Sequence, residues 1–209
     1  MRILELFQQS PLLAIAFLVI MVIALTVHEF SHAWVAYHLG DDTPMLQGRV
    51  TLNPAAHLDP IGSIAFIVLG FGWGRPVEYN PMRLKRHVDE LLVALAGPAS
   101  NLLMAIFFNI LVRLTSNALP GYAQLFDLAS YINVLLASFN IIPIPPLDGS
   151  SIVAYFWPEY RSLAGGQVGL IILLAIMFIP FGSYGTLLTI VLTPITNTFT
   201  ALTHLFGLL

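Results

Sequence analysis

The sequence predicts an all-α polytopic membrane protein with about five to six membrane segments. Hydrophobic residues make up 57% of the 209 residues, and charged residues make up only 9%, against about a quarter in a typical soluble domain. Long apolar runs alternate with glycine- and proline-containing breaks, as expected for several successive spans. We expect one membrane-embedded domain over 1–209, with a core over about 11–155 and additional C-terminal spans over about 162–207.

The first predicted helix covers about 11–38. Residues 11–27 contain no charged side chain, and glycine, aspartate and proline follow the run at Gly40, Asp41, Asp42 and Pro44. The start of this run could imitate a signal peptide. It continues past signal length without a small-residue cleavage site, so we expect the helix to be retained.

The middle of the chain predicts two further spans and one shorter segment. Residues 61–74 are apolar but too short and too glycine-rich to span easily, so we expect a small re-entrant or membrane-surface segment there. Spans are predicted over about 91–114 and 125–140. After Arg161 the chain contains no Lys, Arg, Asp or Glu, and its length suits two more spans separated near Pro180 to Gly185.

Basic residues predict the orientation of these spans. Half of the eight Lys and Arg residues lie in the loop before the second span, at Arg75, Arg83, Lys85 and Arg86. The positive-inside rule therefore makes this loop cytoplasmic. If 61–74 is re-entrant, the first helix also ends on the cytoplasmic side, although Arg2 favours the reverse direction for that helix.

The net charge argues against nucleic-acid binding, and the absence of cysteine excludes thiolate metal ligands. A net charge of −3 and an isoelectric point near 6.0 give no basic surface for nucleic acid, so we expect no nucleic-acid partner. The chain has no cysteine, which excludes disulfides and thiolate metal ligands. Any transition metal must therefore be held by histidine and carboxylate side chains.

The motif HEFSH at 28–32 places ionisable side chains inside the first apolar helix. His28 and His32 are four residues apart, so on a helix they share one face, at the spacing with which two imidazoles bind one zinc ion. Glu29 can approach the open position of the metal without ligating it. In this H-E-x-x-H pattern the glutamate is a general base towards a water that zinc activates. A purely structural buried network is less favoured, because ionisable groups inside a span cost roughly 2.5 kcal/mol or more each.

Zinc also requires a third protein ligand, and Asp148 is the outstanding candidate. It follows three prolines, which prevent a regular helix, and precedes Gly149, which permits a sharp turn. A carboxylate at this break can point sideways into a helical bundle. A simple polar turn is the alternative interpretation of the segment.

Together, HEFSH at 28–32 and FNIIPIPPLDG at 139–149 resemble the site-2 protease family of intramembrane zinc metalloproteases, in particular its short prokaryotic members without PDZ or CBS domains. GRPVEYNP at 74–81 and AGPASN at 96–101 are similar to further segments of that family. The resemblance implies a three-helix metalloprotease core around the metal. It also implies a multi-pass protein of a prokaryotic cell membrane, with the active site toward the cytoplasm.

The resemblance implies residue roles as well. His28, His32 and Asp148 would bind one Zn²⁺ per chain, and Glu29 would be the catalytic base or acid. The partners would be the lipid bilayer and the transmembrane segments of membrane-protein substrates, which the enzyme would hydrolyse. Cleavage of a helical substrate requires local unwinding, and an unpaired strand edge would stabilise the extended peptide; LQGRVTLNP at 46–54, with turn residues around a short β-prone core, predicts such a β-like edge.

Three more residues are candidates for contact with substrate or transition state. Asn140 matches an asparagine that the family places near the active site; it could stabilise an oxyanion or only bind carbonyls freed by the prolines. His57 could stabilise the transition state or hydrogen-bond within its own loop. Asn101 could hold substrate or cap a contact between helices.

Two other classes of function stay open on the sequence. One is a catalytically silent homologue that binds another membrane protein, for which Glu29 would be unnecessary. The other is a metal-dependent transporter with the intramembrane ionisable residues as an ion relay. A transporter would be expected to carry further polar residues across the other leaflet, and these are scarce here.

Overall fold

The computed structural model describes residues 3–164, 167–180 and 185–206. The helices in chain order are α1 (Ile3–Gln9), α2 (Pro11–His38), α3 (Thr43–Leu46), the 3₁₀ helix η1 (Pro54–Ala56), α4 (Pro60–Leu69), the 3₁₀ helix η2 (Pro81–Arg83), α5 (His87–Thr115), α6 (Pro120–Asn140), α7 (Asp148–Phe156), α8 (Tyr160–Ala164), α9 (Gln167–Phe178) and α10 (Leu187–Phe206). Within the described ranges, β pairing is limited to two isolated antiparallel bridges and no strand is formed. The predicted all-α class is therefore confirmed.

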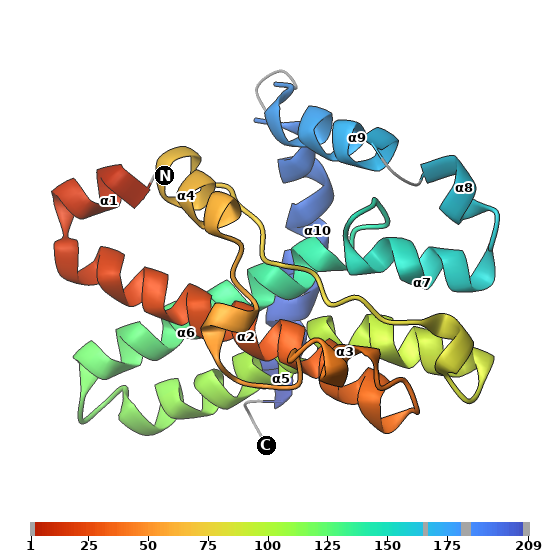
Figure 1. The fold of residues 1–209 in the computed structure, drawn as a ribbon. Coiled ribbons are helices and arrows are strands. Elements are labelled where there is room, and N and C mark those ends of the chain that lie inside the picture. Colours follow the sequence, from red (N-terminus) through yellow and green to blue (C-terminus); the bar gives the residue numbers. More distant parts are fainter. Residues whose placement is uncertain (1–2, 165–166, 181–184, 207–209) are drawn as a thin grey trace.

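Helices α2, α5 and α6 pack against one another, and α7 and α10 lie against α5 (Figure 1). Small side chains of these helices are buried, among them Ala33, Ala36, Ala94, Ala105 and Ala137. Small residues let helix backbones approach closely, as is common in membrane proteins. This close packing brings side chains of α2 and α5 into direct contact.

The prediction of a helix over 11–38 is confirmed by α2. Ser10 caps its start, since its hydroxyl accepts the Leu13 N–H at 3.4 Å, and Pro11 occupies the first turn. After the helix ends, Gly40 adopts a φ of 112°, a conformation that favours glycine. The local sequence thus determines both ends of the helix.

The two predicted middle spans are helical as well. Helix α5 includes 91–114 and α6 includes 125–140, each with an earlier start than the apolar run alone indicates. Of the described helices, α2 and α5 are long and apolar enough to cross a membrane. Together with the composition, these two helices mark a membrane protein, while the total of five to six segments stays a prediction.

The apolar segment 61–74 forms α4 followed by non-helical backbone. The Asp59 carboxylate caps α4 by accepting the Gly62 N–H at 2.7 Å, and Gly70 ends the helix with a φ of 76°. A helix of 10 residues is about 15 Å long, about half of the hydrocarbon thickness. A full span is therefore excluded for α4, and its re-entrant position stays a prediction.

The predicted β-like edge over 46–54 is wrong for this structure. Gly48, with a φ of 68°, turns the chain after α3, and the Arg49 N–H donates to the Pro44 carbonyl at 2.8 Å. The Thr51 N–H then donates to the Arg49 carbonyl at 2.9 Å, which is a tight turn rather than an extended strand. Local turn bonds thus outweigh the β propensity of this stretch.

The predicted C-terminal spans over 162–207 correspond to α8, α9 and α10. Helix α9 has 12 residues and is about 18 Å long, whereas α10 has 20 residues with Pro194 inside it. Most of the predicted break near Pro180 to Gly185 falls on 181–184, which lie outside the described residues. Whether these helices cross the bilayer stays a prediction, as does the division into core and C-terminal spans.

Candidate metal centre

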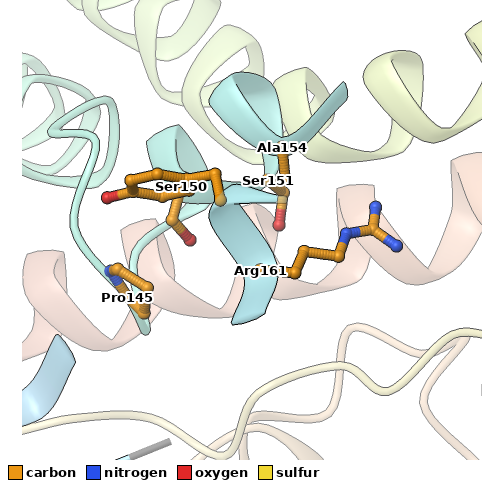
Figure 2. Close-up of a pocket in the computed structure, with 6 residues that line it drawn as sticks. Pro145, Ser150, Ser151, Ala154 and Arg161 are labelled. Carbon is orange, nitrogen blue, oxygen red and sulfur yellow. The ribbon is translucent and has the colours of Figure 1, made fainter. Parts of the chain in front are cut away.

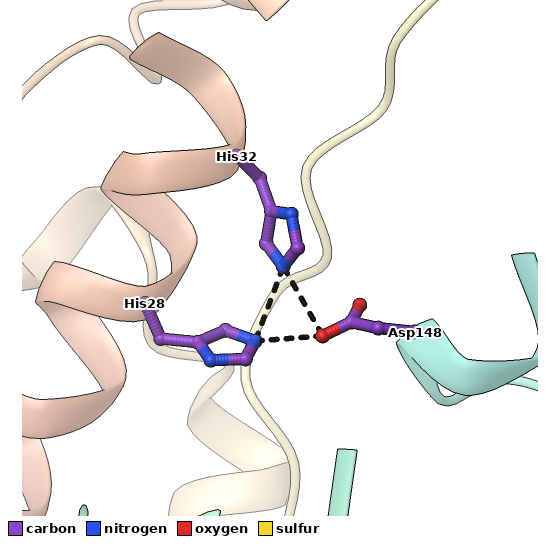
Figure 3. Close-up of side chains that lie close together, drawn as sticks. All are labelled: His28, His32 and Asp148. Carbon is purple, nitrogen blue, oxygen red and sulfur yellow. Dashed lines mark hydrogen bonds and ion pairs between the residues drawn. The ribbon is translucent and has the colours of Figure 1, made fainter. Parts of the chain in front are cut away.

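His28, His32 and Asp148 meet in a compact cluster (Figure 3). The Nε2 atoms of the two histidines lie 3.2 Å apart, and Asp148 Oδ2 lies 3.1 Å from His28 Nε2 and 3.2 Å from His32 Nε2. Both histidines come from α2 and are buried, while Asp148 begins α7 after the proline-rich break. The structure therefore brings together all three residues that were predicted as metal ligands.

Hydrogen bonds on the far side of each imidazole orient the two rings. His32 Nδ1 lies 2.7 Å from the carbonyl oxygen of Val93, which can only accept, so Nδ1 carries the proton. His28 Nδ1 lies 2.7 Å from the side-chain oxygen of Asn101. These contacts leave the Nε2 lone pairs facing Asp148, as metal ligation requires.

Two glycines give the cluster its room. A Cβ atom on Gly97 of α5 would lie 2.3 Å from His32 Nε2 and 2.6 Å from His28 Nε2. A Cβ atom on Gly149 would lie 2.2 Å from the Ile141 carbonyl oxygen. Glycine at 97 therefore lets α5 approach the imidazoles, and glycine at 149 lets the start of α7 pack against the end of α6.

The donor set fits a zinc ion. Zinc binds imidazole nitrogen and carboxylate oxygen at about 2.0–2.1 Å, so tetrahedral geometry separates its ligand atoms by roughly 3.3 Å. The three ligand atoms here lie 3.1–3.2 Å apart. Two imidazoles and one carboxylate form a known catalytic zinc set that leaves a fourth position open.

Glu29 lies next to His28 on α2 and is held from one side. Its Oε2 accepts the Val77 N–H at 3.1 Å and lies 3.9 Å from the Arg49 guanidinium. Its Oε1 accepts no hydrogen bond from the residues that the structure describes. One carboxylate oxygen is thus fixed by the protein, and the other is available to a ligand.

Residues 74–80, here called the strap, supply the Val77 N–H. Arg49 is 3% exposed and donates to two strap carbonyls, that of Pro76 at 3.0 Å and that of Arg75. Burial lowers the pKa of the Arg49 guanidinium, while the nearby Glu29 carboxylate opposes this effect. Arg49 was not among the residues predicted for the site, because its role depends on contacts with the distant strap.

The other end of the strap is held by a second buried charge. Asp41 is fully buried, and its Oδ2 accepts the Asn80 N–H at 2.6 Å. The Arg75 N–H donates to the His57 carbonyl at 2.7 Å. Side chains from the loop after α2 thus fix the strap beside the HEFSH helix.

The three further candidate residues lie in different surroundings. Asn101 contacts His28 directly. His57 is fully buried, and its Nε2 donates to the Thr51 carbonyl at 2.7 Å within its own loop. The Asn140 amide donates to the Leu136 carbonyl at 3.0 Å near the end of α6. The structure therefore brings Asn101 to the cluster and gives His57 and Asn140 local hydrogen bonds.

A small cavity lies between the proline-rich break, α7 and α8 (Figure 2). It is lined by Pro145, Ser150, Ser151, Ala154, Tyr160 and Arg161. The Arg161 guanidinium also pairs with Glu90 of α5. This ion pair connects α8 to the start of α5.

A buried HExxH helix with a distant aspartate beside it, in a helical membrane protein, defines a membrane metallopeptidase.

Residues 115–181 match the model of peptidase family M50. YwhC of Bacillus subtilis, named as a candidate zinc metalloprotease, is 39% identical over 85% of this chain and 87% of its own length. Rip2 of Mycobacterium tuberculosis, similarly named, is 32% identical over 80% of this chain and 70% of its own. The chain therefore belongs to peptidase family M50, the site-2 protease family, which confirms the resemblance of its motifs. No solved structure gives a significant match.

Proposed function

We propose that this protein is an intramembrane zinc metalloprotease that hydrolyses peptide bonds in or near transmembrane segments of membrane-protein substrates. The observation that carries this proposal is the contact of His28 and His32, both on the apolar helix α2, with Asp148 of α7. His28 lies ten residues before the end of α2, roughly 15 Å along the helix, which corresponds to the hydrocarbon zone of a bilayer. The names of the relatives support zinc as the metal and proteolysis as the activity.

The proposed chemistry assigns distinct roles to the site residues. His28, His32 and Asp148 would hold one Zn²⁺ per chain, and the metal would supply a Lewis acid for the scissile carbonyl and the attacking water. Glu29 accepts the proton of the attacking water through its available oxygen Oε1 and returns it to the leaving amine. The Val77 N–H fixes the other oxygen, so the base is oriented before substrate binds.

The proposed surroundings are a lipid bilayer and an unwound substrate segment. Large apolar side chains are exposed on the outer faces of the helices, for example Leu12, Leu103 and Leu114. The basic loop before α5 supports a cytoplasmic position for the active site. Asn140 and His57 stay candidate contacts of substrate, as the sequence predicts, although both side chains make local hydrogen bonds in this structure.

The test is cleavage of single-span peptides, tagged at both ends and reconstituted with the purified protein in liposomes. The wild-type protein should cut at least one member of a panel of such peptides, and a zinc chelator should stop the reaction. Glu29→Gln should retain zinc and lose about 100-fold or more of the rate, because it cannot accept the proton. Undiminished cleavage by Glu29→Gln would exclude Glu29 as the base. A zinc-loaded wild type that cuts no peptide would instead favour a silent binding protein.

A further inference from the structure

Asn133 is a buried polar residue of α6 to which the sequence motifs give no role. It is fully buried, and it hydrogen-bonds in two directions. Its amide nitrogen donates to the Ala129 carbonyl at 2.8 Å, and its Oδ1 accepts from the amide nitrogen of Asn101 at 2.9 Å. An uncharged polar side chain inside a helix bundle is costly without partners. These two bonds therefore account for its burial and connect α6 to α5.

Backbone carbonyls fix the orientation of both asparagine amides. A carbonyl can only accept, so the NH₂ group of Asn133 must face Ala129 and its oxygen must face Asn101. That oxygen also only accepts, so Asn101 must turn its NH₂ group toward it. The Ala24 carbonyl, 3.3 Å from the same Asn101 nitrogen, requires the same orientation. Three acceptors on α2 and α6 thus determine how Asn101 is turned.

The orientation of Asn101 determines the proton position on His28. The remaining Asn101 atom, Oδ1, lies 2.7 Å from His28 Nδ1 and can only accept a hydrogen bond. His28 must therefore carry its proton on Nδ1. Its Nε2 then presents a lone pair to His32 and Asp148, on the opposite side of the ring (Figure 3). A proton on Nε2 would prevent metal ligation through that atom.

We propose that Asn133 is a positioning residue of the metal centre, which acts through Asn101 to fix the tautomer and ring orientation of His28. Helix α6, which contributes no metal ligand, thereby contributes to zinc affinity. His32 needs no such relay, because the Val93 carbonyl contacts its Nδ1 directly. This inference rests on the zinc site proposed above and extends it to a residue of another helix, far from His28 in the sequence.

The test is the dissociation constant of Zn²⁺ itself, measured by competition with a chelator in detergent. The variants are Asn101→Leu, Asn133→Leu and their combination. Loss of a hydrogen-bond partner behind a ligating histidine typically weakens metal binding about 10–100-fold, and we expect this loss for Asn101→Leu. Asn133→Leu should weaken zinc binding by about threefold to tenfold. The double variant should bind no more weakly than Asn101→Leu, because one residue acts through the other.

Ser130→Ala is the matched control. Ser130 is also buried on α6 and donates to α5, to the Ala105 carbonyl at 3.2 Å, but it has no connection to His28. Its loss should leave the zinc constant unchanged. Thermal unfolding of the metal-free proteins shows whether each variant folds. If Asn133→Leu does not fold, Asn133→Ser replaces it, because a serine side chain is too short to reach Asn101.

Several results would overturn the inference. If the folded Asn133 variants bound zinc as tightly as the wild type, Asn133 would have no role at the metal centre, whereas the contact of Asn101 with His28 would be unaffected. Additive losses in the double variant, or an equal loss in Ser130→Ala, would show that Asn133 acts only by packing. If the wild-type protein itself bound no zinc, the proposed function would fail, and the inference would fail with it.

Discussion

Gly97 lies so close to the metal cluster that no side chain fits between it and the two imidazoles. It faces both imidazoles from α5, within the segment AGPASN, and a methyl group there would overlap the two Nε2 atoms. Glycine inside a helix ordinarily costs about 1 kcal/mol relative to alanine. Its presence at this position is explained by the histidines, because no larger side chain leaves their ligand atoms in place.

We expect Gly97→Ala to weaken zinc binding by about tenfold or more, because overpacking of this kind typically costs about 1–3 kcal/mol. Chelator competition measures the effect, and circular dichroism should show undiminished helix content. Gly121→Ala is the control, because a Cβ atom at Gly121 of α6 would meet no atom within 4 Å. Equal zinc binding by Gly97→Ala and wild type would contradict this geometry.

Individual site residues differed in how far the sequence could predict them. The four-residue spacing of His28 and His32 is enough to predict a shared helix face, and the proline break makes Asp148 the leading third candidate, with a polar turn as the alternative. Arg49 and Asn133 could not be assigned in the same way, because their roles depend on contacts between distant segments. Such contacts follow from how helices pack, which local patterns in one sequence do not determine.

The strap is the element that connects the loop after α2 to the catalytic candidate Glu29. Its backbone is held mainly by side chains, those of Arg49, Asp41 and Glu29, and not by a neighbouring strand. Hydrogen bonds to charged groups contribute about 1.5–3 kcal/mol each. The removal of Arg49 should therefore release the strap at the point where it orients the carboxylate.

We expect Arg49→Gln to lower the cleavage rate of a reconstituted peptide by at least about tenfold with unchanged zinc content. A general base typically accelerates a reaction by about 10²–10⁴-fold, and a displaced Glu29 would lose part of this acceleration. Gln47→Ala is the control; Gln47 donates to Glu78 of the strap at 3.2 Å but does not contact Glu29. A full rate in Arg49→Gln would show that the strap is oriented by other contacts. Loss of zinc together with activity would indicate a general collapse of the site.

Helices with long apolar runs were predicted well, and short connecting elements were not. The run over 11–38 is bounded by capping and turn residues, so its ends follow from local chemistry. The stretch 46–54 was misassigned because its β-prone residues adopt turns around the buried Arg49. Side-chain contacts of a charged residue thus outweighed intrinsic propensity, as tertiary context often does.

The predicted orientation of the molecule in the membrane rests on its basic loop. The chain has no cysteine, so single cysteines can report on each side without a background. Met82, in the basic loop before α5, and Leu119, after α5, are both exposed and lie at opposite ends of that helix. We expect a membrane-impermeant maleimide to label Met82→Cys from the cytoplasmic side and Leu119→Cys from the other side. Labelling of both from one side would show that α5 does not cross the membrane.

The metal centre is the feature on which the proposed activity depends, and zinc per chain in detergent-purified protein tests it most directly. The wild type should contain about one zinc per chain, and Glu29→Gln should retain it, because Glu29 contacts the strap and not the ligand cluster. His28→Ala and Asp148→Ala should lose most of the metal while the chain stays folded. A well-folded wild type without zinc, even after supplementation, or undiminished zinc in both ligand variants, would contradict the proposed protease site.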